Sequence, residues 1–273
     1  MILLTGGGGF VGRQVMRNLT EQGHPLRLVL RPNAGAITGL SQATEVIETP
    51  DLFQASREWW GNALSGVDTV VHLAWYTEPG KYLQSERNLT CLAGTLELAR
   101  ASIEAGVRRF VGVGTCAEYD LGPAVLRIDT PLNPQTLYAA CKASAFYVLS
   151  QLLAANAVEF AWCRLFYLYG EGEDERRLVP CLRQRIAAGE PIELTSGDQI
   201  RDYLDVRDAG AMIAEAVIGN HQGPLNICSG IPVTVRQLAE RIADEYGRRD
   251  LLKFGVRPES PFDPPCIVGN SSV

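Results

Sequence analysis

The amino-acid sequence predicts an α/β protein with a doubly wound parallel sheet and a smaller C-terminal lobe. Over the first two-thirds of the 273 residues, short apolar runs alternate with amphipathic helical segments. This alternation is typical of a parallel sheet covered by helices on both faces. A glycine cluster lies between the first apolar run and the first helical segment. After the run at residues 159–165 the alternation weakens, and Pro180 and Pro191 indicate a region of different architecture.

The expected strands and helices follow from these periodicities. Helix 10–22, for example, carries Val11, Val15 and Leu19 on one face, and Gly23 ends it. The other expected helices are residues 89–103, 137–154 and 206–218. The expected strands are residues 2–5, 26–30, 68–74, 109–115, 159–165 and 225–228.

The composition argues against several classes of function. A net charge of −6 and a pI near 5.2 disfavour a nucleic-acid partner, because phosphate contacts need clustered Lys and Arg. No apolar run approaches the ~20 residues that span a bilayer, so we expect no membrane partner. The seven cysteines and three histidines are scattered, and we predict no metal site. An apolar strand at the start, in place of a targeting segment, and unpaired cysteines favour a cytoplasmic location.

The segment T-G-G-G-G-F-V-G at residues 5–12 has the form of a phosphate-binding loop. Gly6, Gly9 and Gly12 lie between a strand and a helix, where a tight turn, a close approach to a pyrophosphate and helix packing each exclude a side chain. The helix N-terminus adds N–H donors and the positive end of a dipole. A merely structural turn is the alternative, but the flanking strand and helix favour a bound dinucleotide.

These features together predict a Rossmann domain that binds NAD(P). We expect this domain to comprise residues 1–168 and 205–229, because the later helix and strand return to the sheet. Residues 169–204 and 230–273 are expected to form a substrate-binding lobe.

The end of the second strand bears on the choice between the two nicotinamide cofactors. An NAD site usually presents Asp or Glu about 20 residues after the loop, where the carboxylate binds the ribose hydroxyls. Here Arg31 occupies that place, and Arg13 follows the last glycine. Two guanidinium groups suit a 2′-phosphate, so NADP(H) is favoured over NAD(H). The alternative is that Arg31 is a solvated charge and the choice of cofactor depends on other residues.

Tyr138 and Lys142 are four residues apart in an expected helix, so they lie on one face. A tyrosine with the ordinary pKa of about 10 is a poor acid or base at neutral pH, and a neighbouring ammonium brings that pKa closer to the working range. In isolation the spacing Y-x-x-x-K is common by chance. Its meaning therefore depends on the motifs around it.

Further motifs occur in a fixed order along the chain. They are HLA (72–74), Asn88, GTCAEY (114–119), YAACK (138–142), RLFYLYG (164–170), LVP (178–180), RDYLDVRD (201–208) and NICSGIPVT (226–234). Together with the glycine loop, this set resembles the extended short-chain dehydrogenases/reductases, the group of nucleotide-sugar epimerases, dehydratases and reductases. The resemblance covers nearly the whole chain.

The resemblance implies a catalytic set of Thr115, Tyr138 and Lys142. Tyr138 would exchange a proton with the reacting oxygen, Thr115 would hydrogen-bond that oxygen, and Lys142 would also hold the nicotinamide ribose. Besides Tyr138 and Lys142, the implied cofactor contacts are Gly6, Gly9, Phe10, Val11, Gly12, Arg31, Asp51, Leu52, Leu73 and Ala74. The implied contacts to a nucleotide-sugar substrate are Trp75, Asn88, Cys116, Tyr167, Leu178, Val179, Arg201 and Arg257.

Arg201 matches an arginine that enzymes of this group direct at the diphosphate of the substrate. A guanidinium group binds phosphate oxygens in a bidentate manner, which suits such a role. If the resemblance is set aside, Arg201 is expected to pair with Asp202 or Asp205 at the surface.

Positions at which this chain departs from the family pattern narrow the range of reactions that it could catalyse. The sugar 4,6-dehydratases carry an Asp-Glu pair directly after the catalytic Thr, whereas this chain has Cys116 and Ala117, which cannot do that acid–base work. Tyr167 also stands where many epimerases have Asn. With Arg31 favouring NADPH, we predict reduction of a nucleoside-diphosphate 4-keto-6-deoxy sugar at carbon 4. The alternatives are a nucleotide-sugar 4-epimerase and a non-catalytic dinucleotide sensor, and the intact catalytic set speaks against the sensor.

The resemblance also implies a homodimer that forms through helices 89–103 and 137–154. The apolar residues of these helices could instead all face the sheet. The expected partners are therefore a nucleotide sugar and a second copy of the chain.

Overall fold

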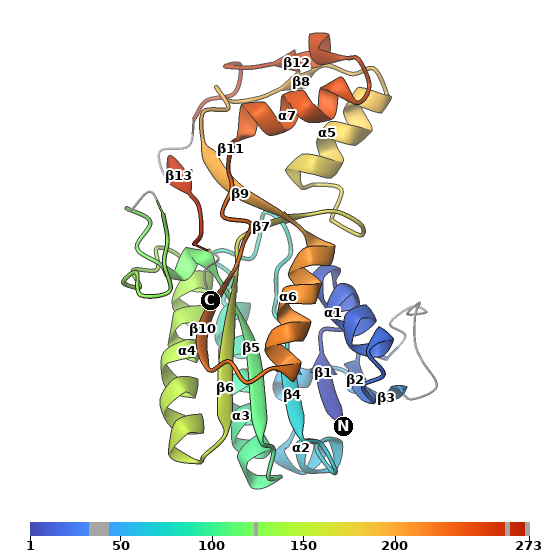
Figure 1. Cartoon of the computed structure of the whole chain (residues 1–273), viewed down its shortest axis with the longest axis vertical. Helices are drawn as coiled ribbons and strands as arrows, with labels where there is room; N and C mark the ends of the chain where they lie inside the picture. The colour runs from blue at the N-terminus through green and yellow to red at the C-terminus, as the bar shows by residue number, and fades with distance from the viewer. Residues whose placement is uncertain (33–43, 123–124, 260–262, 271–273) are drawn as a thin grey trace.

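The computed structural model describes residues 1–32, 44–122, 125–259 and 263–270. It shows an elongated molecule with a large sheet, covered by helices on both faces, at one end and a smaller lobe of short strands and helices at the other (Figure 1). Several connections run between the two ends, so the smaller lobe is assembled from separate segments of the chain.

The large sheet has seven described strands, and all of its neighbouring pairs are parallel. In spatial order these strands are β10 (Gly223–Ile227), β6 (Glu159–Leu165), β5 (Arg109–Thr115), β4 (Thr69–His72), β1 (Ile2–Thr5), β2 (Leu26–Leu30) and β3 (Thr44–Glu48). The chain winds outward from β1 in one direction and then from β4 in the other. This reversal confirms the predicted doubly wound fold class and leaves a crevice for ligands at the carboxyl ends of β1 and β4.

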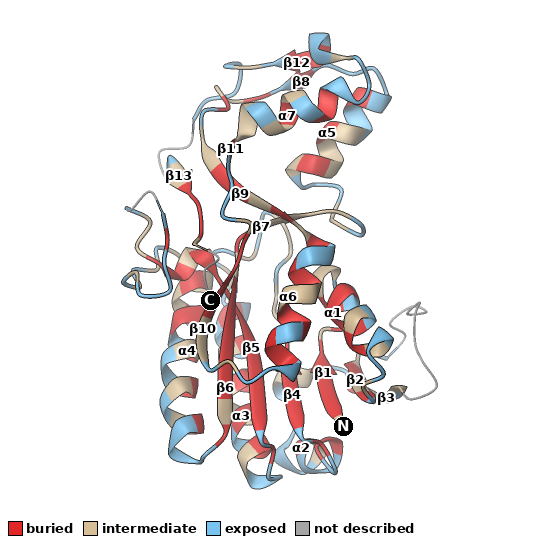
Figure 2. Cartoon of the chain, in the orientation of Figure 1, coloured by how far each residue is buried: buried red, intermediate tan, exposed pale blue. Residues whose placement is uncertain are grey.

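Each face of the sheet has its own hydrophobic core. Leu4 and Val113 pack under α1 (Phe10–Glu21) and α6 (Val206–Ile218). Leu3 and Phe110 point the other way and belong to the core of the second face. The helices on that face are α2 (Arg57–Ala63), α3 (Arg87–Glu104) and α4 (Leu137–Ala155). Figure 2 shows the result, with buried strands between helices whose outer faces are exposed.

Helix α4 is long and apolar enough, by length and composition, to cross a membrane. Its residues Ala145, Leu149 and Leu153 are buried in the core beneath the sheet, and the helix packs along α3. These contacts are those of a core helix, because the apolar stripe is already covered by protein.

The smaller lobe contains two short sheets and a pair of helices. β9 (Ile200–Asp205) lies between β11 (Pro232–Thr234) and β13 (Cys266–Ile267) and also pairs with β7 (Tyr167–Tyr169). β8 (Ile192–Glu193) pairs with β12 (Leu252–Lys253). α5 (Leu178–Ala187) packs on α7 (Val235–Asp244). β7 spans the expected boundary at residue 168, and the division of the chain into two domains stays a prediction.

Sequence periodicity predicted most elements of the large sheet. The expected strands 2–5, 26–30, 109–115 and 159–165 and the expected helix 206–218 have the observed bounds. The expected strand 68–74 ends earlier, at His72, and the expected strand 225–228 begins earlier, at Gly223. β3 was missed because it is an edge strand with largely exposed residues and lacks a buried apolar run.

Candidate active site

The predicted catalytic and cofactor residues gather at the carboxyl ends of the central strands, where open α/β sheets bind their ligands. Thr115 is the last residue of β5, and the glycine loop follows β1 directly. Leu73 and Ala74 continue from β4, and the backbone N–H of Ala74 donates to Thr5 Oγ1 over 3.4 Å. Three neighbouring strands therefore deliver their C-terminal residues to one place.

The glycine loop is packed too closely to carry side chains. Gly6 has a φ of +76°, and a Cβ there would lie 2.8 Å from the backbone nitrogen of Ala74. A Cβ on Gly12 would lie 2.0 Å from the carbonyl oxygen of Gly6. Gly9 is the N-cap of α1, and Phe10 and Val11 form its first turn. This bare backbone at a helix N-terminus fits the pyrophosphate of a dinucleotide.

The other predicted cofactor residues lie around this loop. Arg31 follows β2 directly and is exposed. Arg13 is also exposed, and its Nε donates to the carbonyl oxygen of Gly8 over 3.0 Å. Asp51 caps the short 3₁₀ helix that begins at Leu52, where its carboxylate accepts the backbone N–H of Phe53. Arg13 thus contacts the loop and Arg31 follows the neighbouring strand, and their role in the choice of cofactor stays a prediction.

The three predicted catalytic side chains come together at the end of β5. Thr115 interacts with the Tyr138 phenol and lowers its pKa, against the larger effect of burial. Lys142 lies one turn along α4 and is only 3% exposed. Its Nζ donates to the carbonyl oxygen of Val113 over 2.6 Å. The same Nζ lies 3.9 Å from the centroid of the Trp75 ring, a cation–π contact.

The protonation states differ from the expectation that Lys142 lowers the pKa of Tyr138. Burial raises the pKa of the Tyr138 phenol well above its ordinary value, and Tyr82 and Glu118 add to this effect. Burial lowers the pKa of Lys142 to about 7, against the opposing effect of Glu118. Because the ammonium faces Val113 and Trp75, it does not offset the burial of the phenol. Tyr138 is therefore held in its protonated form, as a proton donor.

Two predicted substrate residues, Trp75 and Asn88, instead anchor the loop between β4 and α3. Asn88 is fully buried, and its Oδ1 accepts the indole N–H of Trp75 over 2.8 Å. Its Nδ2 donates to the carbonyl oxygens of Tyr82 and Ser85. With these bonds the side chain of Asn88 is occupied within the protein, and it positions the loop that borders the site.

Tyr82 is a site residue that sequence reasoning missed. Its ring meets the ring of Tyr138 edge-to-face with centroids 4.8 Å apart, and the backbone N–H of Tyr138 donates to the carbonyl oxygen of Leu83. Tyr82 lies in a loop without a repeating pattern, and only the fold brings it to α4.

Cys116 follows Thr115 in the chain but points into a small apolar cluster with Phe166, Cys228 and Ile267. It is buried, and desolvation raises the pKa of its thiol to about 12. The thiol therefore remains protonated at neutral pH and cannot serve as the general base that a dehydration would need.

Arg201 differs most from its expected surroundings. The guanidinium is buried and pairs with Asp263 over 2.6 Å, not with Asp202 or Asp205. Asp202 is fully buried and accepts backbone N–H groups from Ser229, Gly230 and Gly269, while Asp205 pairs with Arg207. The surface pairing that we gave as the alternative for Arg201 is therefore wrong, because β9 lies inside its sheet.

The remaining predicted substrate residues belong to the smaller lobe. The ring of Tyr167 lies beneath the guanidinium of Arg201 at 5.4 Å and against Tyr203. Leu178 and Val179 begin α5, where Val179 is buried in the core of the lobe. Arg257 is exposed, and no contact places it beside Arg201. The structure thus brings Tyr167 and Arg201 together.

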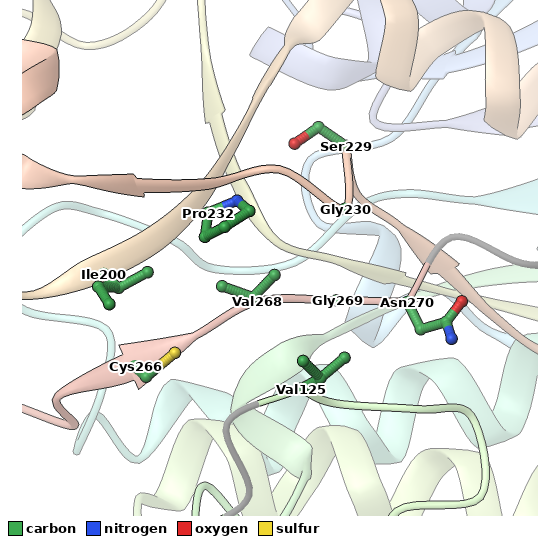
Figure 3. A pocket seen from close by; sticks show the side chains of 9 residues that line it. All are labelled: Val125, Ile200, Ser229, Gly230, Pro232, Cys266, Val268, Gly269 and Asn270. Carbon is green, nitrogen blue, oxygen red and sulfur yellow. The ribbon is translucent and has the colours of Figure 1, made fainter.

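A cavity of about 520 Å³ lies away from the catalytic set, beside β9 and the C-terminal segment. Figure 3 shows its lining, which includes Ile200, Pro232, Cys266 and Val268 together with the polar side chains of Ser229 and Asn270. It contains none of the predicted catalytic residues. We therefore locate the active site by the convergence of Thr115, Tyr138 and Lys142.

Glu118 is the second site residue that the sequence analysis missed. Its carboxylate accepts the backbone N–H of Thr115 over 2.8 Å and pairs with Arg164, and both side chains of the pair are buried. The spacing T-x-x-E at residues 115–118 is that of a capping box, a signal that predicts the bond to Thr115. No comparable pattern predicts the partner in β6.

Within the described residues, no three His, Cys, Asp or Glu side chains cluster in a way that could hold a metal ion. The glycine loop and the Thr115, Tyr138 and Lys142 set carry the chemistry that the sequence predicts for this site.

Residues 2–228 match the NAD dependent epimerase/dehydratase family. The chain belongs to this family. Its relatives are oxidoreductases and epimerases, and the resemblance to extended short-chain dehydrogenases/reductases is confirmed.

Among the relatives, a dTDP-6-deoxy-L-talose 4-dehydrogenase (NAD(+)) of Aggregatibacter actinomycetemcomitans is 25% identical over 272 residues, which cover 98% of each chain. A UDP-glucose 4-epimerase of Corynebacterium glutamicum is 25% identical over 99% of this chain and 87% of its own. A solved UDP-N-acetylglucosamine 4-epimerase of Methanobrevibacter ruminantium has a TM-score of 0.88 at 23% identity, over 99% and 89% of the two chains. The fold is therefore shared along nearly the whole chain.

Proposed function

We propose that this protein reduces the keto group at carbon 4 of a nucleoside-diphosphate 4-keto-6-deoxy sugar, with NADPH as the reductant. The observation that carries the proposal is the state of Tyr138. Its phenol interacts with Thr115 and stays protonated at neutral pH, so it carries the proton that a reduction has to deliver. Reduction of a carbonyl needs such a proton donor beside the developing alkoxide.

The residues of the site divide the work of this reaction. When bound, NADPH supplies a hydride for the carbonyl carbon. As the carbonyl double bond becomes a single bond, Tyr138 gives its proton to the oxygen, which becomes the hydroxyl of the product. Thr115 donates a hydrogen bond to the same oxygen and stabilises the charge that develops on it. Lys142, whose pKa is about 7, would hold the nicotinamide ribose.

The cofactor is proposed from the residues around the glycine loop. Arg31 and Arg13 are exposed cations at the end of β2 and the start of α1. They suit the 2′-phosphate that distinguishes NADPH from NADH. The relative from A. actinomycetemcomitans is named for NAD(+), so NADH is the alternative that a direct comparison has to test.

The substrate class is proposed from the smaller lobe and from the relatives. Arg201 and Tyr167 form a buried cation–π pair on β9 and β7, where a diphosphate could replace the carboxylate of Asp263. Leu178 and Val179 would border the base, and Arg257 would add a phosphate contact. The name of the A. actinomycetemcomitans relative describes oxidation or reduction at carbon 4 of a 6-deoxy sugar nucleotide, which agrees with this proposal.

A nucleotide-sugar 4-epimerase is the second candidate, because several relatives carry that name. An epimerase takes a hydride from its substrate and returns it, so it needs Tyr138 both as a base and as an acid. The raised pKa of Tyr138 favours the acid. The absence of a general base at Cys116 and Ala117 makes a dehydration a poor alternative.

We further propose a homodimer formed through α3 and α4 and a location in the cytoplasm. Leu89 of α3 and Tyr147 and Val148 of α4 are exposed apolar side chains on adjacent helices. A second copy of the chain would bury them. Six of the cysteines, at positions 91, 116, 141, 163, 181 and 228, are thiols without a disulfide, which agrees with a reducing compartment.

The experiment that tests the proposed function offers NADPH or NADH together with a set of nucleoside-diphosphate 4-keto-6-deoxy sugars. We expect the absorbance of NADPH to fall in step with formation of a 4-hydroxy product, and NADPH to be used more efficiently than NADH. Inversion of carbon 4 in a nucleoside-diphosphate 4-hydroxy sugar, offered in parallel, without net oxidation of cofactor would identify an epimerase instead. Faster turnover with NADH would contradict the assigned role of Arg31.

A further inference from the structure

A fully buried carboxylate lies directly beneath the catalytic end of β5. Glu118 accepts the backbone N–H of Thr115 over 2.8 Å, and the Thr115 side chain in turn caps the short 3₁₀ helix that ends at Glu118. The two residues thus fix each other's position. Any displacement of Glu118 would displace Thr115, whose hydroxyl contacts the Tyr138 phenol.

The carboxylate is held from the opposite side by two residues of β6. The indole Nε1 of Trp162 lies 3.1 and 3.2 Å from its two oxygens, and Arg164 Nε donates to Oε2 over 2.8 Å. Arg164 is 1% exposed and also donates to the hydroxyl of Tyr119. All of these partners are donors, so Glu118 acts purely as an acceptor, as an ionised carboxylate does.

Two glycines of β5 make this arrangement possible. A Cβ on Gly114 would lie 2.2 Å from Trp162 Nε1 and 2.3 Å from Glu118 Oε1. A Cβ on Gly112 would lie 2.4 Å from the six-membered ring of Trp162. Residues two apart in a strand share a face, so the pair of glycines opens a flat space across β5 for the indole. The two glycines of the sequence G-V-G-T therefore leave the space that Trp162 and Glu118 occupy.

The same indole connects the carboxylate to Lys142. The Lys142 Nζ lies 5.8 Å from the centroid of the Trp162 ring and donates to Val113, the residue between the two glycines. Several titratable groups interact electrostatically with the two catalytic side chains. Tyr138 interacts with Glu118, Cys116 and Tyr82. Lys142 interacts with Glu118, Cys91 and His72. His72 is neutral, since burial lowers its pKa to about 3, and burial raises the thiol pKa of both cysteines. Glu118 is the carboxylate of this set.

We propose that Glu118 is a positioning residue of the active site, which orients Thr115 through its backbone and stabilises the ammonium form of Lys142 through its charge. Arg164 and Trp162 hold the carboxylate in place but do not replace it. A fixed negative charge near an ammonium favours the charged form of that group. The part that concerns catalysis rests on the proposed function, whereas the effect on Lys142 does not.

The chain offers a direct measurement of this effect, because it has three lysines, Lys81, Lys142 and Lys253. Isotopic labelling of the lysine side chains gives a nuclear magnetic resonance spectrum in which the buried Lys142 is assigned with Lys142→Met. In the wild type we expect Lys142 to titrate with a pKa of about 7. In Glu118→Gln, which keeps an oxygen acceptor for Thr115, we expect the titration to move to lower pH by roughly one unit.

The matched control is Glu159→Gln. Glu159 pairs with Arg109, which is 1% exposed, but it does so at the opposite end of the same sheet. We expect its titration curve for Lys142 to coincide with that of the wild type. An equal shift in the two variants would overturn the proposal, because it would show a general response to loss of a buried ion pair.

Glu118→Gln leaves Arg164 buried without its carboxylate, which destabilises the folded protein. The double variant Glu118→Gln, Arg164→Met removes both charges and provides a second test. We expect a smaller shift to lower pH than in Glu118→Gln, because the double variant also removes a cation that opposes the effect of Glu118. An unchanged Lys142 titration in either folded variant would contradict the proposal. Failure of both variants to fold would also overturn it, since it would assign Glu118 to the core alone.

An activity measurement tests the part that concerns Thr115. With the wild type active, we expect Glu118→Ala, which removes the acceptor for the Thr115 backbone, to lose about 10- to 100-fold in kcat at a nearly unchanged KM, and Glu118→Gln to lose less. A wild type without reductase activity would refute the proposed function but leave the lysine titration valid. A kcat equal to that of the wild type would contradict the orienting role of Glu118.

Discussion

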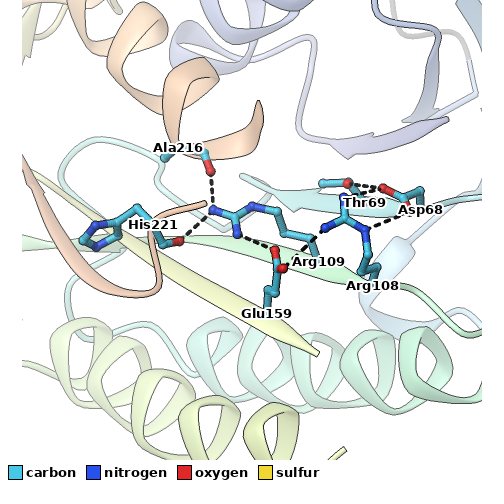
Figure 4. A network of polar contacts seen from close by, with 7 residues as sticks. All are labelled: Asp68, Thr69, Arg108, Arg109, Glu159, Ala216 and His221. Carbon is cyan, nitrogen blue, oxygen red and sulfur yellow. Dashed lines mark hydrogen bonds and ion pairs between the residues drawn. The ribbon is translucent and has the colours of Figure 1, made fainter. Parts of the chain in front are cut away.

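Two buried arginines lie at opposite ends of neighbouring strands and differ in what their carboxylate partners do. Arg109 begins β5 and pairs with Glu159, and its guanidinium also donates to the carbonyl oxygens of Ala216 and His221 (Figure 4). Arg164 lies near the end of β6 and pairs with Glu118. Both guanidinium groups are 1% exposed, so each needs its carboxylate to offset the loss of water.

The two ion pairs, Arg109 with Glu159 and Arg164 with Glu118, differ in the residues that surround them. Around Arg109 the acceptors belong to β6, to α6 and to the segment between α6 and β10, so the network joins elements that are far apart in the chain. Around Arg164 the carboxylate also holds Thr115, whose hydroxyl contacts Tyr138. The same kind of ion pair thus stabilises the fold at the amino ends of the strands and arranges chemistry at their carboxyl ends.

The largest effect is expected from a change at the carboxyl end. Tyr138→Phe removes the proton donor, and we expect kcat/KM to fall roughly 100- to 10,000-fold while calorimetry shows unchanged NADPH binding. Tyr147→Phe is the matched control, because Tyr147 lies in the same helix with 56% exposure. Full activity of Tyr138→Phe would refute the assignment of the site.

Lys142→Met tests whether the burial of Lys142 at the catalytic end lowers the free energy of unfolding. The pKa of Lys142 is about 7 in the folded protein and about 10.5 when unfolded, so between these values only the unfolded chain binds the proton. The free energy of unfolding of the wild type should therefore gain a contribution from this group as pH rises from 7 toward 10.5. We expect Lys142→Met to lose this dependence, to be inactive and to be more stable at pH 7 by roughly 1–4 kcal/mol.

The measurement is denaturant unfolding at several pH values. A variant that is less stable than the wild type at pH 7 would show that the contacts of Lys142 with Val113 and Trp75 outweigh the cost of its burial. In that case the buried groups at both ends of the sheet would increase the free energy of unfolding.

The amino end is tested by Glu159→Ala, which leaves Arg109 with only its two carbonyl acceptors. We expect the free energy of unfolding to fall by about 1–3 kcal/mol, because a buried donor loses its charged partner. Turnover of the folded enzyme should equal that of the wild type, as steady-state kinetics at a temperature well below unfolding would show. A large loss of kcat would mean that this network also acts on the site.

Arg201 is a third buried arginine, and the substitution that tests its ion pair has the smallest expected effect. Arg201 is 3% exposed, but its partner Asp263 is 40% exposed and could leave when a diphosphate binds. We expect Asp263→Asn to lower the KM for the nucleotide sugar several-fold, because a competing anion is removed from the binding-competent state. The KM for NADPH should not change. A higher KM for the sugar would show that Asp263 contributes to binding.

The sequence predicted features that depend on near neighbours. Periodicity located β5 and α6, the glycine loop was recognised from its spacing, and Tyr138 and Lys142 were placed on one helix face because they are four residues apart. The capping pattern of Thr115 with Glu118 was available in the same way.

The missed features depend on distant residues. Glu118 and Arg164 are 46 positions apart, and their pairing follows from the alignment of β5 with β6. Arg201 finds Asp263 because β13 lies beside β9. The direction of the Lys142 side chain, which decides its pKa, depends on Trp75 from a loop after another strand.

The central claim is tested most directly by NADPH that carries deuterium at the transferable position of the nicotinamide. With a nucleoside-diphosphate 4-keto-6-deoxy sugar, we expect one deuterium at carbon 4 of the product for each NADPH oxidised, and no product with Tyr138→Phe. No deuterium at carbon 4, together with inversion of carbon 4 in a nucleoside-diphosphate 4-hydroxy sugar without net oxidation of cofactor, would contradict the account and identify the protein as an epimerase.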